Sequence, residues 1–374
     1  MELTRALVAR RSITPEDAGC QELLIARLRP LGFAVERLRF GEVDNFWALR
    51  RGGPGPVLCL AGHTDVVPTG PVEQWSSPPF ESCVRDGQVY GRGVADMKSG
   101  LAAMVTATEA FVHRRPAHQG AIAFLVTSDE EGKSVDGTRR VVEWLQARGQ
   151  GIDYCLLAEP SSLEQFGDNI RVGRRGSLSA RLTVHGVQGH VAYPERADNP
   201  IHRLAPALAE LVAREWDRGS AHFKPTTFQV SNLNAGTGAP NVIPGELVAR
   251  FNLRWSPAQT LEGLKATVTG ILDRHGLRYS IDWYEAGMPF HTPPGRLAAA
   301  VSDAVQAVAG RRPQATTGGG TSDGRFIAPL GAEIVELGVS NQTIHQIDER
   351  CLVTEIDALH GALLGTLERL LPAA

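Results

Sequence analysis

Four short apolar runs, separated by long helical patterns, constrain the fold of this chain more than any other feature of its sequence. Each run is mostly apolar and does not alternate, as in strands that are buried on both faces of a parallel sheet. The runs are Val57–Ala61, Ala121–Thr127, Tyr154–Ala158 and Glu333–Leu337. Strands that alternate with helices in this way indicate an open α/β sheet.

Helical periodicity fills the stretches between and beside these runs. We expect helices over Pro15–Leu31, Lys98–Val112, Val135–Arg148, Arg296–Val308 and Glu355–Leu371.

The middle of the chain has a different pattern, in which apolar and polar residues alternate. Ser177–His185 and Leu247–Trp255 alternate strictly, which indicates strands with one buried and one exposed face. With the other predicted elements they give the order β-α-β-β-α-β, the split unit of ferredoxin-like domains. These other elements are helices over Pro200–Trp216 and Leu261–His275 and strands over Thr226–Leu233 and Arg278–Glu285.

The change of pattern predicts an inserted domain. We place it at residues 177–288, within a larger α/β domain formed by residues 1–176 and 289–374. One continuous mixed sheet is the alternative, but the change from buried runs to alternating strands favours an insertion.

Composition restricts the partners and the compartment. A chain of 374 residues that is 43% hydrophobic can bury a substantial core, and its net charge of −3 gives no case for nucleic acid or an anionic membrane as partner. No run approaches the roughly 18 apolar residues of a membrane span, and the N-terminus lacks the apolar core of a secretory signal. The five scattered cysteines form no CxxC motif, so we expect reduced thiols and a cytoplasmic protein.

Histidine and carboxylate side chains follow the apolar runs, at the points where the predicted strands end. In an open α/β sheet, ligands bind outside the carboxyl ends of the strands. Five separate segments are therefore expected to bring these side chains to one edge, which core packing does not explain. The candidates are His63, Asp65, Asp96, Glu130, Glu131, Glu159 and His345. Taken singly, each could instead be a hydrogen-bonded structural residue or part of a solvated loop.

Imidazole and carboxylate ligands without cysteine suit zinc or a similar divalent ion in an open catalytic site. There are more candidates than one ion needs, and they fit two ions that share one carboxylate. Asp65 lies two residues after His63 and would face the same side of an extended segment, as a carboxylate that orients the imidazole does. Glu130 and Glu131 are adjacent and diverge, so one can bind metal while the other acts as general base.

Four motifs together resemble the zinc-dependent amidohydrolases related to aminoacylase and glutamate carboxypeptidase. They are Gly62–Pro68, Gly91–Lys98, Ser128–Gly132 and Ala158–Pro160. The resemblance implies a mixed-sheet, zinc-peptidase-like catalytic domain with an inserted ferredoxin-like dimerisation domain. It also implies two divalent metal ions, Zn²⁺ in the first place with Co²⁺ or Mn²⁺ as alternatives, and a homodimer formed through the inserted domain.

The resemblance implies a metal-binding role for five residues. One zinc ion would be bound by His63 and Glu159, the other by Glu131 and His345, and Asp96 would bridge both.

Three catalytic roles follow from the same resemblance. Glu130 would be the general base and acid, and Asp65 would orient a metal-binding histidine. His190 would cross the dimer interface to the partner's active site.

Further segments narrow the resemblance to members of this family that hydrolyse the amide of an N-succinylated diamino dicarboxylic acid. They are Arg174–Ser177, Val187–Pro194, Asn241–Pro244, Gly319–Phe326 and Asn341–His345. Such a substrate carries several carboxylates, for which the planar guanidinium of arginine is the best partner. The residues expected to contact it are Arg174, Tyr193, Asn241, Arg254, Thr321, Arg325 and Asn341, and backbone N–H groups of Gly318–Gly320 are expected to approach an anion.

Three other functions compete with this expectation. A sibling deacylase, such as an acetylornithine deacetylase or an aminoacylase, would share the metal ligands and differ in the carboxylate pocket. An exopeptidase of the same fold would cleave dipeptides. A non-catalytic binding protein is disfavoured because every catalytic position is filled, and the glycines match no nucleotide-binding motif.

Overall fold

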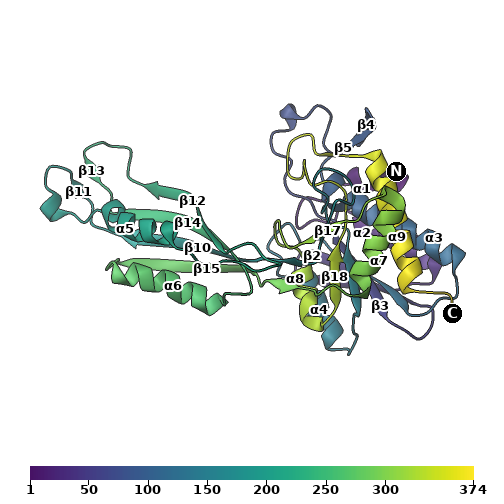
Figure 1. Cartoon of the computed structure of the whole chain (residues 1–374). Helices are drawn as coiled ribbons and strands as arrows, with labels where there is room; N and C mark the ends of the chain where they lie inside the picture. The colour runs from purple at the N-terminus through teal and green to yellow at the C-terminus, as the bar shows by residue number, and fades with distance from the viewer. The chain divides into compact units, whose positions relative to one another are not determined.

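The computed structural model describes residues 1–374 and divides the chain into two compact units. Unit 1 comprises Met1–Gly173, His291–Thr316 and Ser322–Ala374, so it contains both ends of the chain (Figure 1). Unit 2 comprises Arg174–Phe290 together with Thr317–Thr321. The segment predicted to be inserted, 177–288, lies inside unit 2, whereas no sequence pattern indicates that Thr317–Thr321 belongs there.

An eight-stranded sheet forms the centre of unit 1. Its four inner strands β6, β3, β7 and β18 are neighbours and parallel, which confirms the four strands predicted from the apolar runs. The other strands include an antiparallel hairpin, so the sheet is mixed. In spatial order the strands are β1 (Ala34–Phe40), β2 (Val43–Arg51), β6 (Ala121–Thr127), β3 (Val57–His63), β7 (Tyr154–Leu157), β18 (Glu333–Glu336), β8 (Asn169–Arg171) and β17 (Gln314–Thr316).

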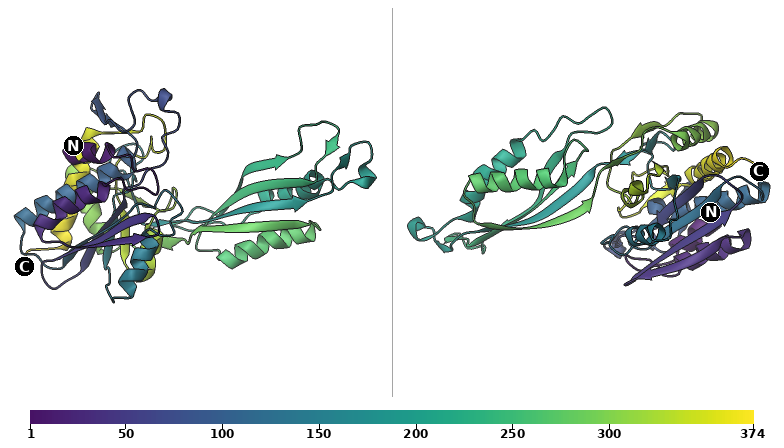
Figure 2. Two further views of the ribbon diagram at one scale, coloured as in Figure 1. Left: turned by 180° about the vertical axis from the view of Figure 1, so that it is seen from behind. Right: turned by 90° about the horizontal axis from the view of Figure 1, so that it is seen from below.

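Helices cover both faces of this sheet (Figures 1 and 2). Leu58 and Leu60 of β3 point into a core shared with the helices of one face. These helices are α2 (Cys20–Leu28), α3 (Ser99–Arg114), α7 (Arg296–Ala309) and α9 (Val353–Leu370), and α1 (Glu2–Val8) packs on α3. The other face carries α4 (Thr138–Gln146) and α8 (Gly324–Ile327), which pack on β2, β6 and β7.

Helix α9 shows why these segments form helices and where their stability comes from. Apolar residues recur every three or four positions along it, and all of them are buried against α3 and α7. Each fully buried leucine of this stripe stabilises the fold by roughly 1.5–3 kcal/mol. The stripe consists of Ile356, Leu359, Leu363, Leu367 and Leu370.

The largest error in a predicted helix boundary lies in the N-terminal part of the chain. The helix expected over Pro15–Leu31 begins only at Cys20, and a short 3-10 turn covers Arg29–Leu31. Gly19 has a φ of 80°, which is a left-handed conformation that does not continue a helix. The Asp17 carboxylate accepts a hydrogen bond from the backbone N–H of Gln21 and so caps the shortened helix.

A small three-stranded sheet joins two distant parts of unit 1. Its order is β19 (Arg350–Leu352), β5 (Gln88–Tyr90), β4 (Cys83–Arg85). Strand β5 leads into the Gly91–Lys98 segment, and β19 follows the loop that carries His345. Pairing of these two strands therefore brings two of the predicted motifs together.

Unit 2 is an antiparallel sheet of four strands with helices on one face. Its spatial order, β12-β14-β10-β15, and the element order β-α-β-β-α-β are those of a ferredoxin-like domain. The strands are β10 (Gly176–His185), β12 (Thr227–Ala235), β14 (Glu246–Trp255) and β15 (Tyr279–Gly287), and the helices are α5 (Pro200–Ala213) and α6 (Leu261–Arg274). Alternate residues of β10 and β14 pack against the helices, as the alternation predicts.

The remaining strands of the chain are two residues long. Strands β11 (Gly189–His190) and β13 (Val242–Ile243) pair within unit 2, and β9 (Gly173–Arg174) and β16 (Phe290–His291) lie where the chain passes from one unit to the other. None of the helices is both long and apolar enough to cross a membrane.

Candidate metal centre

The carboxyl ends of the inner strands of unit 1 carry the predicted histidine and carboxylates. His63 is the last residue of β3, and Glu159 comes shortly after the end of β7. Gly338, after β18, runs so close to this point that a Cβ atom on it would lie 2.2 Å from the carbonyl oxygen of Glu159. Only glycine allows this approach, and the parallel register brings the strand ends to one edge of the sheet.

Asp96 lies between two histidines and offers one carboxylate oxygen to each. His63 Nε2 is 3.2 Å from Asp96 Oδ1 and 3.6 Å from Glu159 Oε1. His345 Nε2 is 3.5 Å from Asp96 Oδ2 and 3.0 Å from Glu131 Oε1. The structure thus brings all five predicted metal ligands together as two groups that share one aspartate.

The donor atoms fit divalent cations in number, chemistry and spacing. Two ligands of a tetrahedral zinc ion lie roughly 3.4 Å apart when each metal–ligand distance is about 2.0–2.2 Å. The distances within the two groups are 3.0–3.6 Å. Ligand atoms of His63, Asp96 and Glu131 also lie within 4.8 Å of one another. The residues present therefore suit a pair of ions bridged by a carboxylate.

The electrostatics of the cluster also favour positive charge. Burial opposes the imidazolium of His63, but the hydrogen bond to Asp96 and the charge of Glu159 raise its pKa well above the usual value. Hydrogen bonds to Asp96 and Glu131 raise the pKa of His345 to about 10. Burial opposes ionisation of Asp96, but its two histidine partners outweigh this and lower its pKa. Because metal ligands must be deprotonated, binding of a cation by these groups would release protons from the histidines.

Glu130 is largely but not fully buried beside the cluster, with 13% of its side chain exposed, and forms no ion pair with either histidine. Burial and the negative charge of Glu159 raise its pKa well above that of an ordinary glutamate. Arg325 lies beside it, with Nη1 3.9 Å from Glu130 Oε1. A carboxyl whose pKa is raised in this way holds a proton more readily than an ordinary glutamate, which suits a general base and acid. Its neighbour Glu131 turns instead to His345, so the two side chains diverge as predicted.

Asp65 differs from the expectation that its carboxylate orients His63. The close partner of His63 Nδ1 is the backbone oxygen of Asp65, at 2.9 Å, while the nearest carboxylate oxygen is 3.6 Å away. The carboxylate instead accepts hydrogen bonds from the backbone N–H groups of Glu130 and Glu131, at 3.2 and 3.0 Å. Asp65 therefore fixes the turn that carries these two glutamates, a role that spacing along an extended strand does not reveal.

Several residues around the cluster were not predicted from the sequence. Buried Asp323 accepts a hydrogen bond from Thr138 at 2.6 Å and lies 4.0 Å from Arg325, which places that arginine beside Glu130. Glu349 and Arg92 form a buried ion pair next to Asp96. Arg92 could have been found from the sequence, because it lies within the Gly91–Lys98 motif. Nothing in the sequence around Glu349 indicates that this residue lies near the cluster.

The residues predicted to contact substrate are divided between the two units. Arg325 and Asn341 belong to unit 1, and the backbone N–H of Asn341 donates to Ser162 O at 3.0 Å. The others are in unit 2: Arg174, Tyr193, Asn241, Arg254 and Thr321.

The glycine turn 318–320 differs from its predicted use. Arg174 is buried and donates from Nη1 to the carbonyl oxygens of Gly318 and Gly320, at 3.0 and 3.4 Å. The turn therefore presents carbonyl oxygens to an arginine, where backbone N–H groups for an anion were expected.

His190 lies in unit 2 on the short ribbon of β11 and β13. Its side chain is exposed, accepts a hydrogen bond from Ala192 N at 3.1 Å and is 5.8 Å from the ring of Tyr193. Asn241 closes the same ribbon, where its carbonyl oxygen accepts from Val191 N at 3.1 Å. Three of the predicted residues thus form one exposed group.

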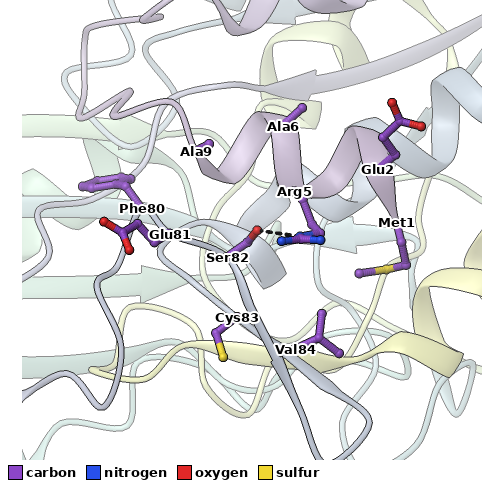
Figure 3. A pocket seen from close by; sticks show the side chains of 10 residues that line it. All are labelled: Met1, Glu2, Arg5, Ala6, Ala9, Phe80, Glu81, Ser82, Cys83 and Val84. Atoms are coloured by element: carbon purple, nitrogen blue, oxygen red, sulfur yellow. Dashed lines mark hydrogen bonds between the residues drawn. The ribbon is translucent and has the colours of Figure 1, made fainter.

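A recess of about 940 Å³ also lies on unit 1, between helix α1 and the segment 80–84 (Figure 3). Arg5 donates a hydrogen bond to Ser82 across it, at 3.2 Å. None of the clustered histidines and carboxylates lines this recess, so we assign it no part in the chemistry.

The sequence of the chain from residue 59 to 369 matches the model of peptidase family M20/M25/M40. The chain belongs to this family. M20 proteins are metal-dependent hydrolases that hold a dinuclear centre, and the paired donor groups around Asp96 agree with that chemistry.

Curated M20 relatives match the chain over nearly its whole length. A succinyl-diaminopimelate desuccinylase of Thioalkalivibrio sulfidiphilus is 59% identical over 371 residues, which are 99% of this chain and 98% of the relative. The protein of the same name from Pseudomonas syringae is 58% identical over 372 residues, with the same coverage of both chains.

Solved structures of M20 proteins share the fold at low sequence identity. An M20 metallo-carboxypeptidase from Sulfolobus solfataricus is similar with a TM-score of 0.81 and 18% identity, over 98% of this chain and 97% of the other. A dinuclear metal-binding M20 peptidase from Bacillus subtilis has a TM-score of 0.71 and 16% identity over the same shares. These likenesses confirm the mixed α/β fold.

Proposed function

We propose that this chain is a cytoplasmic amidohydrolase that converts N-succinyl-L,L-2,6-diaminopimelate and water to succinate and L,L-2,6-diaminopimelate. One observation carries the choice of substrate: relatives named for this activity are 56–59% identical over 98–99% of both chains. A largely buried carboxyl, Glu130, beside a donor set for two cations supports hydrolysis as the chemistry. The five cysteines are free thiols, which suits the cytoplasm.

The proposed metal ligands form two binding positions. We infer that His63 and Glu159 hold one ion, that Glu131 and His345 hold the other, and that Asp96 bridges them; zinc is the first choice, with cobalt or manganese as alternatives. When bound, such ions polarise an amide carbonyl and make water acidic enough to supply hydroxide near neutral pH.

The protein side chains move the protons. Glu130 takes a proton from the attacking water, and its raised pKa suits it to hold that proton. It then gives the proton to the nitrogen of the leaving amine. Negative charge that develops on the carbonyl oxygen needs a donor as well, and His190 of a second subunit is the residue we assign to it. One well-placed donor contributes roughly 3 kcal/mol to the transition state.

The carboxylates of the substrate need fixed cations. Arg174 and Arg325 are buried guanidinium groups, and Arg254 lies near the end of β14, opposite Ser177 of β10. We propose that these arginines bind the succinyl and amino-acid carboxylates, since arginine forms paired hydrogen bonds to such groups. The polar side chains that would complete the contacts are Tyr193, Asn241, Thr321 and Asn341.

A direct comparison of substrates tests the proposed function. After reconstitution with zinc, we expect kcat/KM for succinyl-diaminopimelate to exceed that for acetylornithine by about 10- to 150-fold, because a charge-assisted hydrogen bond to the succinyl carboxylate is worth roughly 1.5–3 kcal/mol. Preference for acetylornithine, for another acetyl amino acid or for a dipeptide would instead identify a sibling deacylase or a dipeptidase. The same assay in excess chelator is the control and should show no turnover.

We propose that the working unit is a homodimer formed through unit 2. Strand β12 is an edge of its sheet, and most of its residues are exposed, including the apolar Leu233. An unpaired strand edge is a ready surface for another chain. His190 is exposed on the same unit and far in sequence from the metal ligands, which fits a residue that serves a second subunit.

Mixing two inactive variants tests whether His190 acts across the dimer. Each of His190→Ala and Glu130→Ala is expected to be inactive by itself, but a heterodimer of the two has one centre with its own Glu130 and the partner's intact His190. Up to about a quarter of wild-type activity should return once subunits exchange, because half of the dimers are mixed and each has one complete centre. Exchange is verified with two different affinity tags, and isolated heterodimers without activity contradict the assignment.

A further inference from the structure

Glu349 is a buried carboxylate for which the proposed mechanism has no use. It is 1% exposed and lies in the loop between His345 and β19. Both of its oxygens accept hydrogen bonds from the backbone of the segment that carries Asp96. Oε1 accepts from Ala95 N at 2.9 Å and Asp96 N at 3.1 Å, and Oε2 accepts from Gly93 N at 2.9 Å.

The segment that Glu349 holds is irregular. Asp96 has φ −119° and ψ 94°, which is not helical, and Gly93 has a left-handed φ of 77°. A Cβ atom at Gly93 would lie 2.2 Å from the side chain of Val66, so the segment is also tightly packed. Buried N–H groups outside regular structure need acceptors, and leaving them without one is costly. The Glu349 carboxylate supplies three of these acceptor positions.

Arg92 pairs with Glu349 and connects it to the backbone of His345, on the other side of the cluster. Its Nη1 is 2.8 Å from Glu349 Oε2, which balances the buried charge. Its Nη2 lies 3.4 Å from Thr69 O and 3.5 Å from His345 O, and the guanidinium sits 5.1 Å from the ring centre of Trp75. The ion pair therefore contacts the backbone of two proposed metal ligands that are far apart in sequence.

Backbone pairing fixes Glu349 itself. Its carbonyl oxygen accepts from Gly91 N at 3.0 Å, and the next residue, Arg350, pairs with Tyr90 in the β19–β5 ladder. Glu349 thus directly precedes β19, and its carboxylate accepts hydrogen bonds from the segment that follows the neighbouring strand β5. A residue whose backbone and side chain are both hydrogen-bonded in this way has little freedom to change its conformation.

We propose that Glu349 is a positioning residue that fixes the backbone of Asp96, so that one oxygen of Asp96 faces His63 and the other faces His345. This inference rests on the two-cation centre proposed above. Glu349 touches neither cation nor substrate, and acts by holding the shared ligand in the one orientation that serves both positions. Outer carboxylates of this kind typically change metal affinity 10- to 100-fold when they are replaced.

The variant Glu349→Gln tests the proposal, because its amide NH₂ cannot accept from the N–H groups that the carboxylate serves. Metal-free protein is titrated with Zn²⁺ and with Co²⁺. We expect wild type to bind two equivalents, and the variant to bind the second 10- to 100-fold more weakly with an altered visible Co²⁺ spectrum. With both ions saturating, kcat should remain reduced while KM changes less than about twofold.

Glu109→Gln is the matched control. It breaks another carboxylate–arginine pair, the bidentate contact of Glu109 with Arg27 at 2.6 Å, on helix α3. This variant should bind both ions as wild type does. If Glu349→Gln does not fold, Glu349→Asp keeps the charge but shortens the reach, and we expect roughly a 10-fold loss for the second ion.

Unchanged affinity and an unchanged Co²⁺ spectrum in the Glu349 variant would overturn the positioning role, even if the variant melts at a lower temperature. A wild-type protein that binds fewer than two ions would contradict the proposed function and this role with it. The two failures are therefore distinguished by the wild-type titration.

Discussion

Glu130→Gln should abolish turnover while leaving both metal ions bound. Glu130 lies largely buried beside the donor groups but is not among them, and its pKa is raised by desolvation and by the charge of Glu159. The amide that replaces it has the same size but can neither take a proton from water nor give one to the amine. General acid–base catalysis contributes up to about 10⁴-fold, and one residue that serves both proton transfers should approach that limit. We therefore expect kcat to fall about 10⁴-fold.

Metal analysis and steady-state kinetics on the same preparation check this result. The variant should still bind two equivalents of zinc, with KM close to that of wild type. Glu143→Gln, on the exposed face of α4, is the control and should behave as wild type. An active Glu130→Gln enzyme would remove the general base from the mechanism, and loss of metal would instead assign Glu130 as a ligand.

Asp96→Ala should lose the dinuclear centre altogether. Its two oxygens lie 3.2 and 3.5 Å from the two histidines, so this carboxylate is shared by both groups. Removal of the shared ligand weakens both positions at once, so we expect at most one weakly bound ion and a loss of at least about 10⁴-fold in kcat/KM. That loss corresponds to roughly 5–6 kcal/mol, which is within the several kcal/mol that metal ions contribute to stabilising charge in the transition state.

Isothermal titration with Zn²⁺ measures this loss directly. Asp303→Ala removes an aspartate of similar size from the surface of α7, where it pairs with Arg312, and should leave two binding events. Binding of two ions by Asp96→Ala with wild-type affinity would show that the histidines and glutamates suffice, and would refute a bridging role for Asp96.

Local patterns predicted the inner framework of the catalytic unit but not its margins. The runs that became β3, β6, β7 and β18 are mostly apolar because both faces of these strands are buried, so they can be recognised without knowledge of their neighbours. Strand β1 was not predicted. It is an edge strand whose residues are all exposed or partly exposed, so its sequence shows no clear alternation of apolar and polar residues. The helix at Cys20 was extended too far because periodicity does not register the left-handed turn at Gly19.

The candidate site was likewise predicted only in part. That residues near strand ends, such as His63, Glu131 and Glu159, lie close together could be predicted, because parallel strands have their carboxyl ends at one edge of the sheet. The hydrogen bonds of Asp65 to the next motif could not, since they depend on how two turns meet in space. Glu349 was missed for the same reason, because its partners lie more than 250 residues away.

The sequence alone determined which side chains are available for chemistry and which strands they follow, because the local composition shows where buried strands lie and where they end. Only the tertiary structure decided how those side chains are oriented. Orientation depends on hydrogen bonds and ion pairs between segments far apart in the chain, such as Glu349 with the backbone of Asp96 and Arg92. Such contacts leave no periodic trace in the sequence, since each is made by a single residue at a single place.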